Sequence, residues 1–188
     1  MELDVHSWTD ALGMYERRFT IAKVTRREHE DWAFDVRSLM RGDTPDARGW
    51  LVNDPFSEEF ERLDNPFYPF TEPPVGIMEA DAFRQRLFEI PRASAKRFLV
   101  ALSTQWLNVE KEQDFEGRRA GLEEKADVIL SRFPEGSRFY ANTGGGSGEM
   151  DYYKRISTCS GVSVYDWDPG LILVSETEVG MVWAFDPK

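Results

Sequence analysis

Two apolar runs near the carboxyl terminus decide how this chain folds. The sequence reads Gly170-Leu171-Ile172-Leu173-Val174-Ser175 and, after a short gap, Gly180-Met181-Val182-Trp183-Ala184-Phe185-Asp186. Their β-branched and aromatic residues favour strands. The gap is too short for a parallel return, which needs a dozen or more residues, so the strands must be antiparallel neighbours. We therefore predict strands at Leu171–Ser175 and Met181–Phe185, with a turn at Glu178-Val179-Gly180.

Similar strand-favouring segments lie just upstream. Predicted strands cover Arg138–Asn142, Tyr152–Thr158 and Val162–Asp166. Residues that favour turns, Ser160-Gly161 and Asp168-Pro169-Gly170, stand between them. Residues 137–186 are therefore expected to form an antiparallel β-meander.

Helical patterns fill most of the remaining sequence, in residues 1–41 and 79–133. One predicted helix rests on apolar residues at helical spacing, namely Leu12, Tyr15, Phe19 and Ala22. A capping box at Thr25 and Glu28 predicts the start of a second helix. Further helices are predicted over residues 79–90, from Pro91 onward, and over residues 114–133. The expected fold is α+β, a single domain over residues 1–188 with N-terminal helices packed on a C-terminal antiparallel β-meander.

Residues 42–78 differ from both zones, and we call them the acidic wrap. They hold six of the ten prolines, which disfavour long helices and central strands. One short helix is expected at Ser57–Leu63, where Ser57 can cap the first turn. The aromatic content of the segment is too high for a loose linker. We expect an ordered loop that wraps over the core.

Composition excludes several classes of function. The chain has 188 residues, with 34 acidic against 23 basic side chains and a net charge of −11. That balance argues against nucleic-acid binding and against docking on anionic membranes, since both need a surplus of Lys and Arg. The amino terminus has no basic signal region, and no apolar run is long enough for a membrane span. We expect a cytoplasmic protein.

The residue types that usually carry catalysis are scarce. One cysteine and two histidines predict no disulfide, no metal site and no cofactor. Cys159 has no base nearby in the sequence and is expected to be packing material. His29 lacks the second histidine of a zinc motif, and Asp168 belongs to a turn signature beside Asp166. The glycine-rich run at 144–148 lacks the Lys-Ser/Thr of a phosphate loop and is expected to be a flexible hairpin loop. No catalytic residue is predicted, and the chain is not expected to be an enzyme.

The distribution of charge points instead to a protein partner. Residues 42–90 carry eleven acidic side chains and only four arginines. This excess can be a solvated face that keeps the protein soluble, or a docking surface for a basic partner. The predicted partner-binding residues are Asp43, Asp46, Trp50, Asp54, Glu58, Glu59, Glu61 and Asp64. Trp50 would be the apolar anchor among the carboxylates.

In its acidity, small size, scarcity of cysteine and C-terminal hairpin, the chain resembles the immunity proteins of bacterial polymorphic-toxin and contact-dependent inhibition systems. The resemblance is carried by the two apolar runs quoted above and by no residue motif. It implies a cytoplasmic antidote that binds its cognate toxin and blocks the toxin's active site. The acidity suits this role, because many such toxins are basic nucleases. Two other functions stay open from the sequence: a structural or assembly component of a phage or secretion system, and an enzyme with an unrecognised carboxylate site. The oligomeric state is open as well.

Overall fold

The computed structural model describes residues 3–16, 18–42, 44, 46–50, 54, 60–144 and 150–186. The α-helices within these residues are α1 (Val5–Leu12), α2 (Ala33–Arg41), α3 (Ile77–Gln85), α4 (Arg92–Leu102) and α5 (Phe115–Ser131). Short 3-10 helices are η1 (Gly13–Tyr15), η2 (Phe60–Leu63), η3 (Gln105–Leu107) and η4 (Val109–Lys111). The strands are β1 (Thr20–Arg26), β2 (Phe88–Ile90), β3 (Arg138–Ala141), β4 (Gly170–Val174) and β5 (Glu178–Ala184).

The five strands form one antiparallel sheet in the order β1-β5-β4-β3-β2. The hairpin of β4 and β5 pairs Leu171 with Val182 and Val174 with Val179, as the two apolar runs predict. β3 extends the meander on one side of the hairpin. On the other side β1 pairs with β5 along its whole length, from Thr20 opposite Ala184 to Arg26 opposite Glu178.

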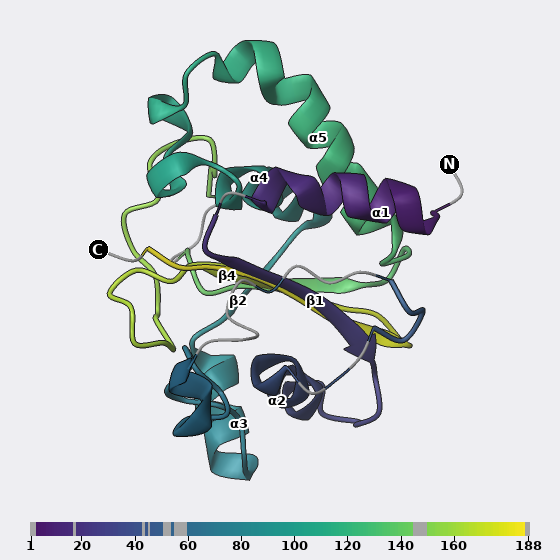
Figure 1. Ribbon diagram of the computed structural model, residues 1–188, viewed down its shortest axis with the longest axis vertical. Coiled ribbons are helices and arrows are strands. Elements are labelled where there is room, and N and C mark those ends of the chain that lie inside the picture. The colour runs from purple at the N-terminus through teal and green to yellow at the C-terminus, as the bar shows by residue number, and fades with distance from the viewer. Residues whose placement is uncertain are drawn as a thin grey trace.

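Helices cover both faces of the sheet, which gives three layers (Figure 1). α1, α4 and α5 lie on one face, where Phe98, Leu99 and Ile129 are buried in a core. α2 and α3 lie on the other face, over a second core that contains Phe83 and Trp183. The α+β fold class is thus confirmed, but the helices enclose the sheet instead of packing on one side of it.

Gly170 shows how tightly the second core meets the sheet. A Cβ atom built at this position would lie 2.0 Å from ring carbons of Trp183, so only glycine lets the indole lie across β4. Trp183 is fully buried and contacts the ring of Phe70 at 6.2 Å between centroids, edge to face. The aromatic side chain from β5 therefore fixes the second core to the middle of the sheet.

The largest error of the sequence-based prediction is β1. Ala22 and Thr25 were expected on helices, yet Thr20–Arg26 is a strand with six of its seven residues buried. Because helices cover both faces of the sheet, this strand has no polar alternation to mark it. The predicted capping box is also wrong, because the backbone N–H of Glu28 donates to the carboxylate of Asp35 at 3.1 Å, and α2 begins only at Ala33.

Three smaller predictions are corrected in the same way. The helix predicted to reach residue 90 ends at Gln85, and β2 follows it as a three-residue edge strand. The segments 152–158 and 162–166 are not strands, apart from an isolated bridge between Phe70 and Ser163. The turn predicted at residues 178–180 belongs to β5, and the chain turns at Ser175, whose hydroxyl accepts the N–H of Glu178 at 2.9 Å. The strands at β3, β4 and β5 and the helices at α4 and α5 agree with the prediction.

Candidate partner-binding surface

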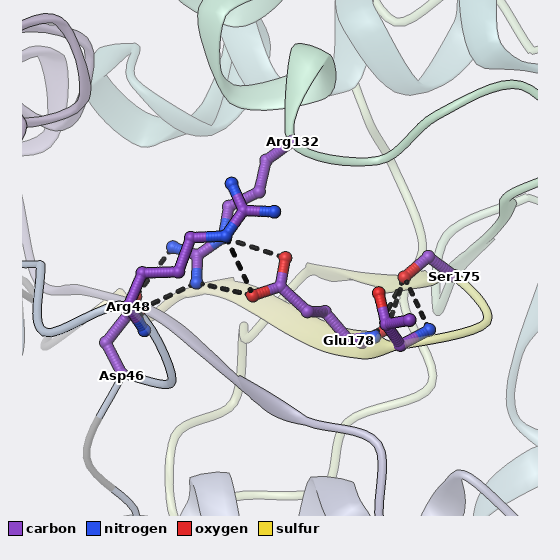
Figure 2. A network of polar contacts seen from close by, with 6 residues as sticks. Asp46, Arg48, Arg132, Ser175 and Glu178 are labelled. Carbon is purple, nitrogen blue, oxygen red and sulfur yellow. Dashed lines mark hydrogen bonds and ion pairs between the residues drawn. The ribbon is translucent and has the colours of Figure 1, made fainter. Parts of the chain in front are cut away.

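The acidic wrap is fixed to the body of the protein first through Asp46. Its carboxylate accepts two hydrogen bonds from the guanidinium of Arg132, at 2.6 and 2.7 Å. The same guanidinium donates to Glu178 at the start of β5, at 2.8 and 3.1 Å (Figure 2). The Arg132 and Asp46 side chains are 0% and 1% exposed. Burial alone would lower the pKa of Arg132, but the hydrogen bonds to the two carboxylates raise it above its ordinary value.

Two tryptophans lie against this buried cation, with 5.6 Å between their ring centroids. The Arg132 guanidinium lies 4.8 Å from the ring centroid of Trp8 and 4.5 Å from that of Trp50. Arg48 also lies over the Trp50 ring, at 5.0 Å. Trp50, expected to be a surface anchor for a partner, is half-buried and packs between two arginines of its own chain. Its indole therefore stabilises the fold at the beginning of the wrap.

A second attachment holds the wrap to β1 and α2. Asp54 forms ion pairs with Lys23 of β1 and with Arg62 of η2, and its side chain is 4% exposed. Arg62 also donates to the carbonyl oxygen of Arg41, at the end of α2, at 2.9 Å. Asp54 is thus another acidic residue that the fold turns inward, against a lysine that is itself buried.

The final part of the wrap is fixed by its own turn. The side chain of Asn65 accepts the N–H of Phe67 and donates to the carbonyl oxygen of Phe70, both at 3.0 Å. Phe70 is fully buried in the second core, and the N–H of Thr71 donates to Val162 at 2.9 Å. These contacts close a compact turn that leads from η2 toward α3.

The segment between these attachments, together with the start of α3, exposes large apolar side chains. Among the described residues nine large hydrophobic side chains are exposed, and five of them lie between positions 60 and 78. They are Phe60 (77%), Leu63 (73%), Val75 (48%), Ile77 (75%) and Met78 (81%). Single exposed hydrophobics are ordinary, and it is their concentration in this stretch of the chain that makes it a candidate interaction site.

Carboxylates accompany these apolar side chains. Glu61, Asp64 and Glu79 are exposed, and none of them forms an ion pair with another described residue. η2 and the start of α3 lie on the side of the sheet that α2 covers, at the lower end of Figure 1. We call this set of residues the docking surface: Phe60, Glu61, Leu63, Asp64, Val75, Ile77, Met78 and Glu79.

The structure separates the predicted partner-binding residues into two groups. Asp46, Trp50 and Asp54 are used inside the fold, so they do not form an outward-facing acidic patch. Glu61 and Asp64 lie on the docking surface. The remaining three, Asp43, Glu58 and Glu59, lie outside the described residues, as do residues 145–148 of the glycine-rich run and the beginning of the helix expected from Ser57.

Sequence reasoning missed the apolar half of the docking surface. The prediction counts Phe60 among the aromatic residues that order the wrap and names Leu63 only as the end of a short helix, and it does not single out Ile77 or Met78. The sequence carries no signal for them, because the small buried face of α3, only Ala80 and Phe83, is known only from the fold. A helix with so small a buried face leaves little core for bulky residues at its start.

The structure also places the residues weighed for catalysis. Cys159 is half-buried, with its Sγ atom 4.0 Å from Asp168, and burial raises the pKa of its thiol. Asp168 is fully buried and accepts the backbone N–H of Val162 at 2.9 Å. His29 contacts the buried carboxylate of Asp35 through Nδ1, at 2.7 Å. Within the part of the chain that the structure describes, no three His, Cys, Asp or Glu side chains are grouped to hold a metal ion.

Comparison of the chain with protein-family models, with curated proteins and with solved structures finds no match. In the described parts of the chain, no helix has both the length and the apolar character that crossing a membrane requires. Inference about function therefore rests on the geometry of the docking surface.

Proposed function

We propose that this protein acts by binding another protein, as an immunity protein that neutralises a cognate basic bacterial toxin. The observation that carries the proposal is the docking surface, in which exposed apolar side chains stand beside carboxylates that no cation of the described chain neutralises. An interface needs a centre that loses its water and a polar rim that selects the partner. Ile77 and Met78 suit the centre, and Glu61, Asp64 and Glu79 suit the rim.

The attachments of the wrap support a binding role. A loop that must become ordered on binding loses affinity, because the entropy of its backbone and side chains is lost at that moment. Here the turn closed by Asn65, and the ion pair and backbone hydrogen bond of Arg62, hold the segment that carries Phe60 and Leu63. The surface is thus ordered before any partner arrives, which favours tight binding.

The overall charge supports a basic partner. With a net charge of −11, the protein attracts cationic surfaces over distances comparable to the Debye length, about 8 Å at physiological salt. Carboxylates near the contact then raise the rate of association and disfavour acidic competitors. A nuclease toxin has a cationic surface of this kind, because it must bind phosphates.

The test is co-expression with the protein encoded by the adjacent reading frame, the place where a cognate toxin gene is expected. The proposal predicts that this neighbour arrests growth when expressed alone, and that co-expression restores growth through a one-to-one complex. The double variant Ile77→Ser, Met78→Ser should abolish the rescue while melting at the wild-type temperature. Val5→Ser, which changes an exposed valine of α1, is the matched control and should rescue fully.

Two outcomes would contradict the proposal. One is a double variant that rescues as well as wild type. The other is concentration-dependent self-association of the pure protein through Ile77 and Met78, since that result favours an assembly component.

A further inference from the structure

A hollow of about 600 Å³ opens at one end of the sheet, and none of its lining residues belongs to the docking surface. It lies where β1 ends, β3 begins and β4 turns into β5, facing the residues that precede α2 and the end of α3. Its volume falls within the range of about 300–1,000 Å³ that is typical of small-molecule sites. Its lining includes three arginines, Arg27, Arg84 and Arg138, together with three acidic residues, Glu30, Asp31 and Glu176.

The three arginines differ in how their charges are balanced. Arg84 forms ion pairs with Asp31 and Asp81, so its charge is compensated within the fold. Arg27 instead donates to neutral backbone carbonyls, at 2.8 Å to Glu30 and 3.2 Å to Ser175. These bonds fix the guanidinium in place without neutralising it.

Arg138 is the second cation that forms no ion pair among the described residues, but the Tyr140 hydroxyl and the Glu89 carboxylate both lie near enough to raise the pKa of its guanidinium. It is exposed at the start of β3, and its closest polar side-chain contact is the hydroxyl of Tyr140, at 3.5 Å. Neither Arg138 nor Arg27 forms an ion pair with any residue that the structure describes. A guanidinium presents parallel N–H donors that match the oxygens of a carboxylate or phosphate, so two of them at one hollow favour an anion.

One wall of the hollow is aromatic. The rings of Trp32 and Tyr140 are stacked, with 4.9 Å between centroids and 22° between planes, and both residues are half-buried. Aromatic rings beside two guanidinium groups that form no ion pair with a described residue suit a ring that carries a negative group. We propose that this hollow binds a small aromatic anion, a flat ring bearing a carboxylate or phosphate, with the charged group between Arg27 and Arg138.

Acidic side chains also line the hollow and oppose an anion. Asp31 is engaged with Arg84, but Glu30 and Glu176 are exposed and form no ion pair among the described residues. Because these carboxylates repel an anion, removal of the Glu176 charge should strengthen binding of the same anion that removal of the Arg138 charge weakens.

The experiment is a titration of the labelled protein with phenyl phosphate and, separately, with inorganic phosphate at constant ionic strength. The indole N–H signal of Trp32, assigned through Trp32→Phe, reports binding by NMR. We expect a saturable shift, with phenyl phosphate bound more tightly than inorganic phosphate. Arg138→Gln should weaken the binding of phenyl phosphate about tenfold, because it removes a charged hydrogen-bond donor from the site. Glu176→Gln should tighten it.

Arg155→Gln is the matched control, because Arg155 is an exposed arginine that does not line the hollow. It should bind phenyl phosphate as wild type does. The proposal is overturned by a shift that does not saturate, by equal losses in Arg138→Gln and Arg155→Gln, or by inorganic phosphate binding as tightly as phenyl phosphate. Arg138, Glu176 and Arg155 are all exposed, so the three Gln variants should fold.

Discussion

Asp46 and Glu61 belong to the same acidic wrap and have opposite roles. Asp46 is buried against Arg132 and takes part in a network that joins α1, the wrap, the end of α5 and β5. Glu61 is exposed in η2 among large apolar side chains and has no ion pair with a described residue. The comparison shows that the local excess of charge is partly structural. An acidic stretch predicts a binding surface only after its buried members have been set aside.

The largest loss of stability is expected when the buried network around Arg132 is disrupted. Arg132→Met leaves the carboxylate of Asp46 buried without its cation, and it leaves Glu178 with Arg48 alone, at 3.7 Å. Removal of one partner from a buried charge network costs about 3–5 kcal/mol, so the free energy of unfolding should fall by that amount in urea titrations. Arg155→Met, at an exposed site, should change it by no more than about 0.5 kcal/mol. A small loss in Arg132→Met would mean that the network contributes little.

A gentler pair of substitutions tests the two carboxylates directly. Asp46→Asn keeps the shape of the side chain but removes the charge that faces Arg132, and it should cost about 1–3 kcal/mol of unfolding free energy. Glu61→Gln makes the same chemical change at an exposed position and should cost about 0.5 kcal/mol or less. Both values come from chemical denaturation at neutral pH. Equal losses of unfolding free energy in the two variants would show that the buried carboxylate of Asp46 stabilises the fold no more than the exposed carboxylate of Glu61 does.

Asp168 shows what burial does to a carboxylate without a cation. It is as buried as Asp46 but has no cation partner among the described residues. Burial raises the pKa of Asp168, and hydrogen bonds only partly offset this. The folded state therefore holds the proton more tightly than the unfolded state does. The stability that this protonation contributes is present below the ordinary Asp pKa and is lost as pH rises through the raised pKa.

Replacing Asp168 by Asn should remove that part of the pH dependence. Measured by thermal or urea unfolding across the acid range, the variant should lack the decline in stability that wild type shows as pH rises through the raised pKa. An identical decline in both proteins would contradict the assignment. The pH dependence of stability in Asp46→Asn, measured in the same way, is the comparison for a buried carboxylate that has a cation partner.

The sequence could predict those elements whose signal is local. The hairpin of β4 and β5 follows from two apolar runs with a short gap, and α5 follows from its spacing of Leu122, Ala126 and Ile129. β1 could not be found in this way, because a strand covered on both faces has no alternation and its neighbours Leu12 and Tyr15 suggest a continuing helix. β2 has only three residues, too few to give a pattern.

The candidate site was predictable only in part, for a related reason. The cation that draws Asp46 into the core lies 86 residues further along the chain, and the lysine that holds Asp54 lies on a strand that the pattern does not reveal. Contacts between distant segments decide which acids remain at the surface. The sequence therefore located the acidic segment, whereas the apolar side chains of Ile77 and Met78 became visible only with the fold.

The most direct test of the account is the association rate of the protein with its partner as a function of salt. The triple variant Glu61→Lys, Asp64→Lys, Glu79→Lys reverses the rim of the docking surface. The triple variant Glu110→Lys, Glu124→Lys, Glu135→Lys makes the same change in net charge at exposed acids elsewhere. The account predicts a wild-type rate that falls as salt rises, a rate at least about tenfold lower for the first variant, and a much smaller loss for the second. A first variant that associates as fast as wild type, or two variants that are slowed equally, would contradict it.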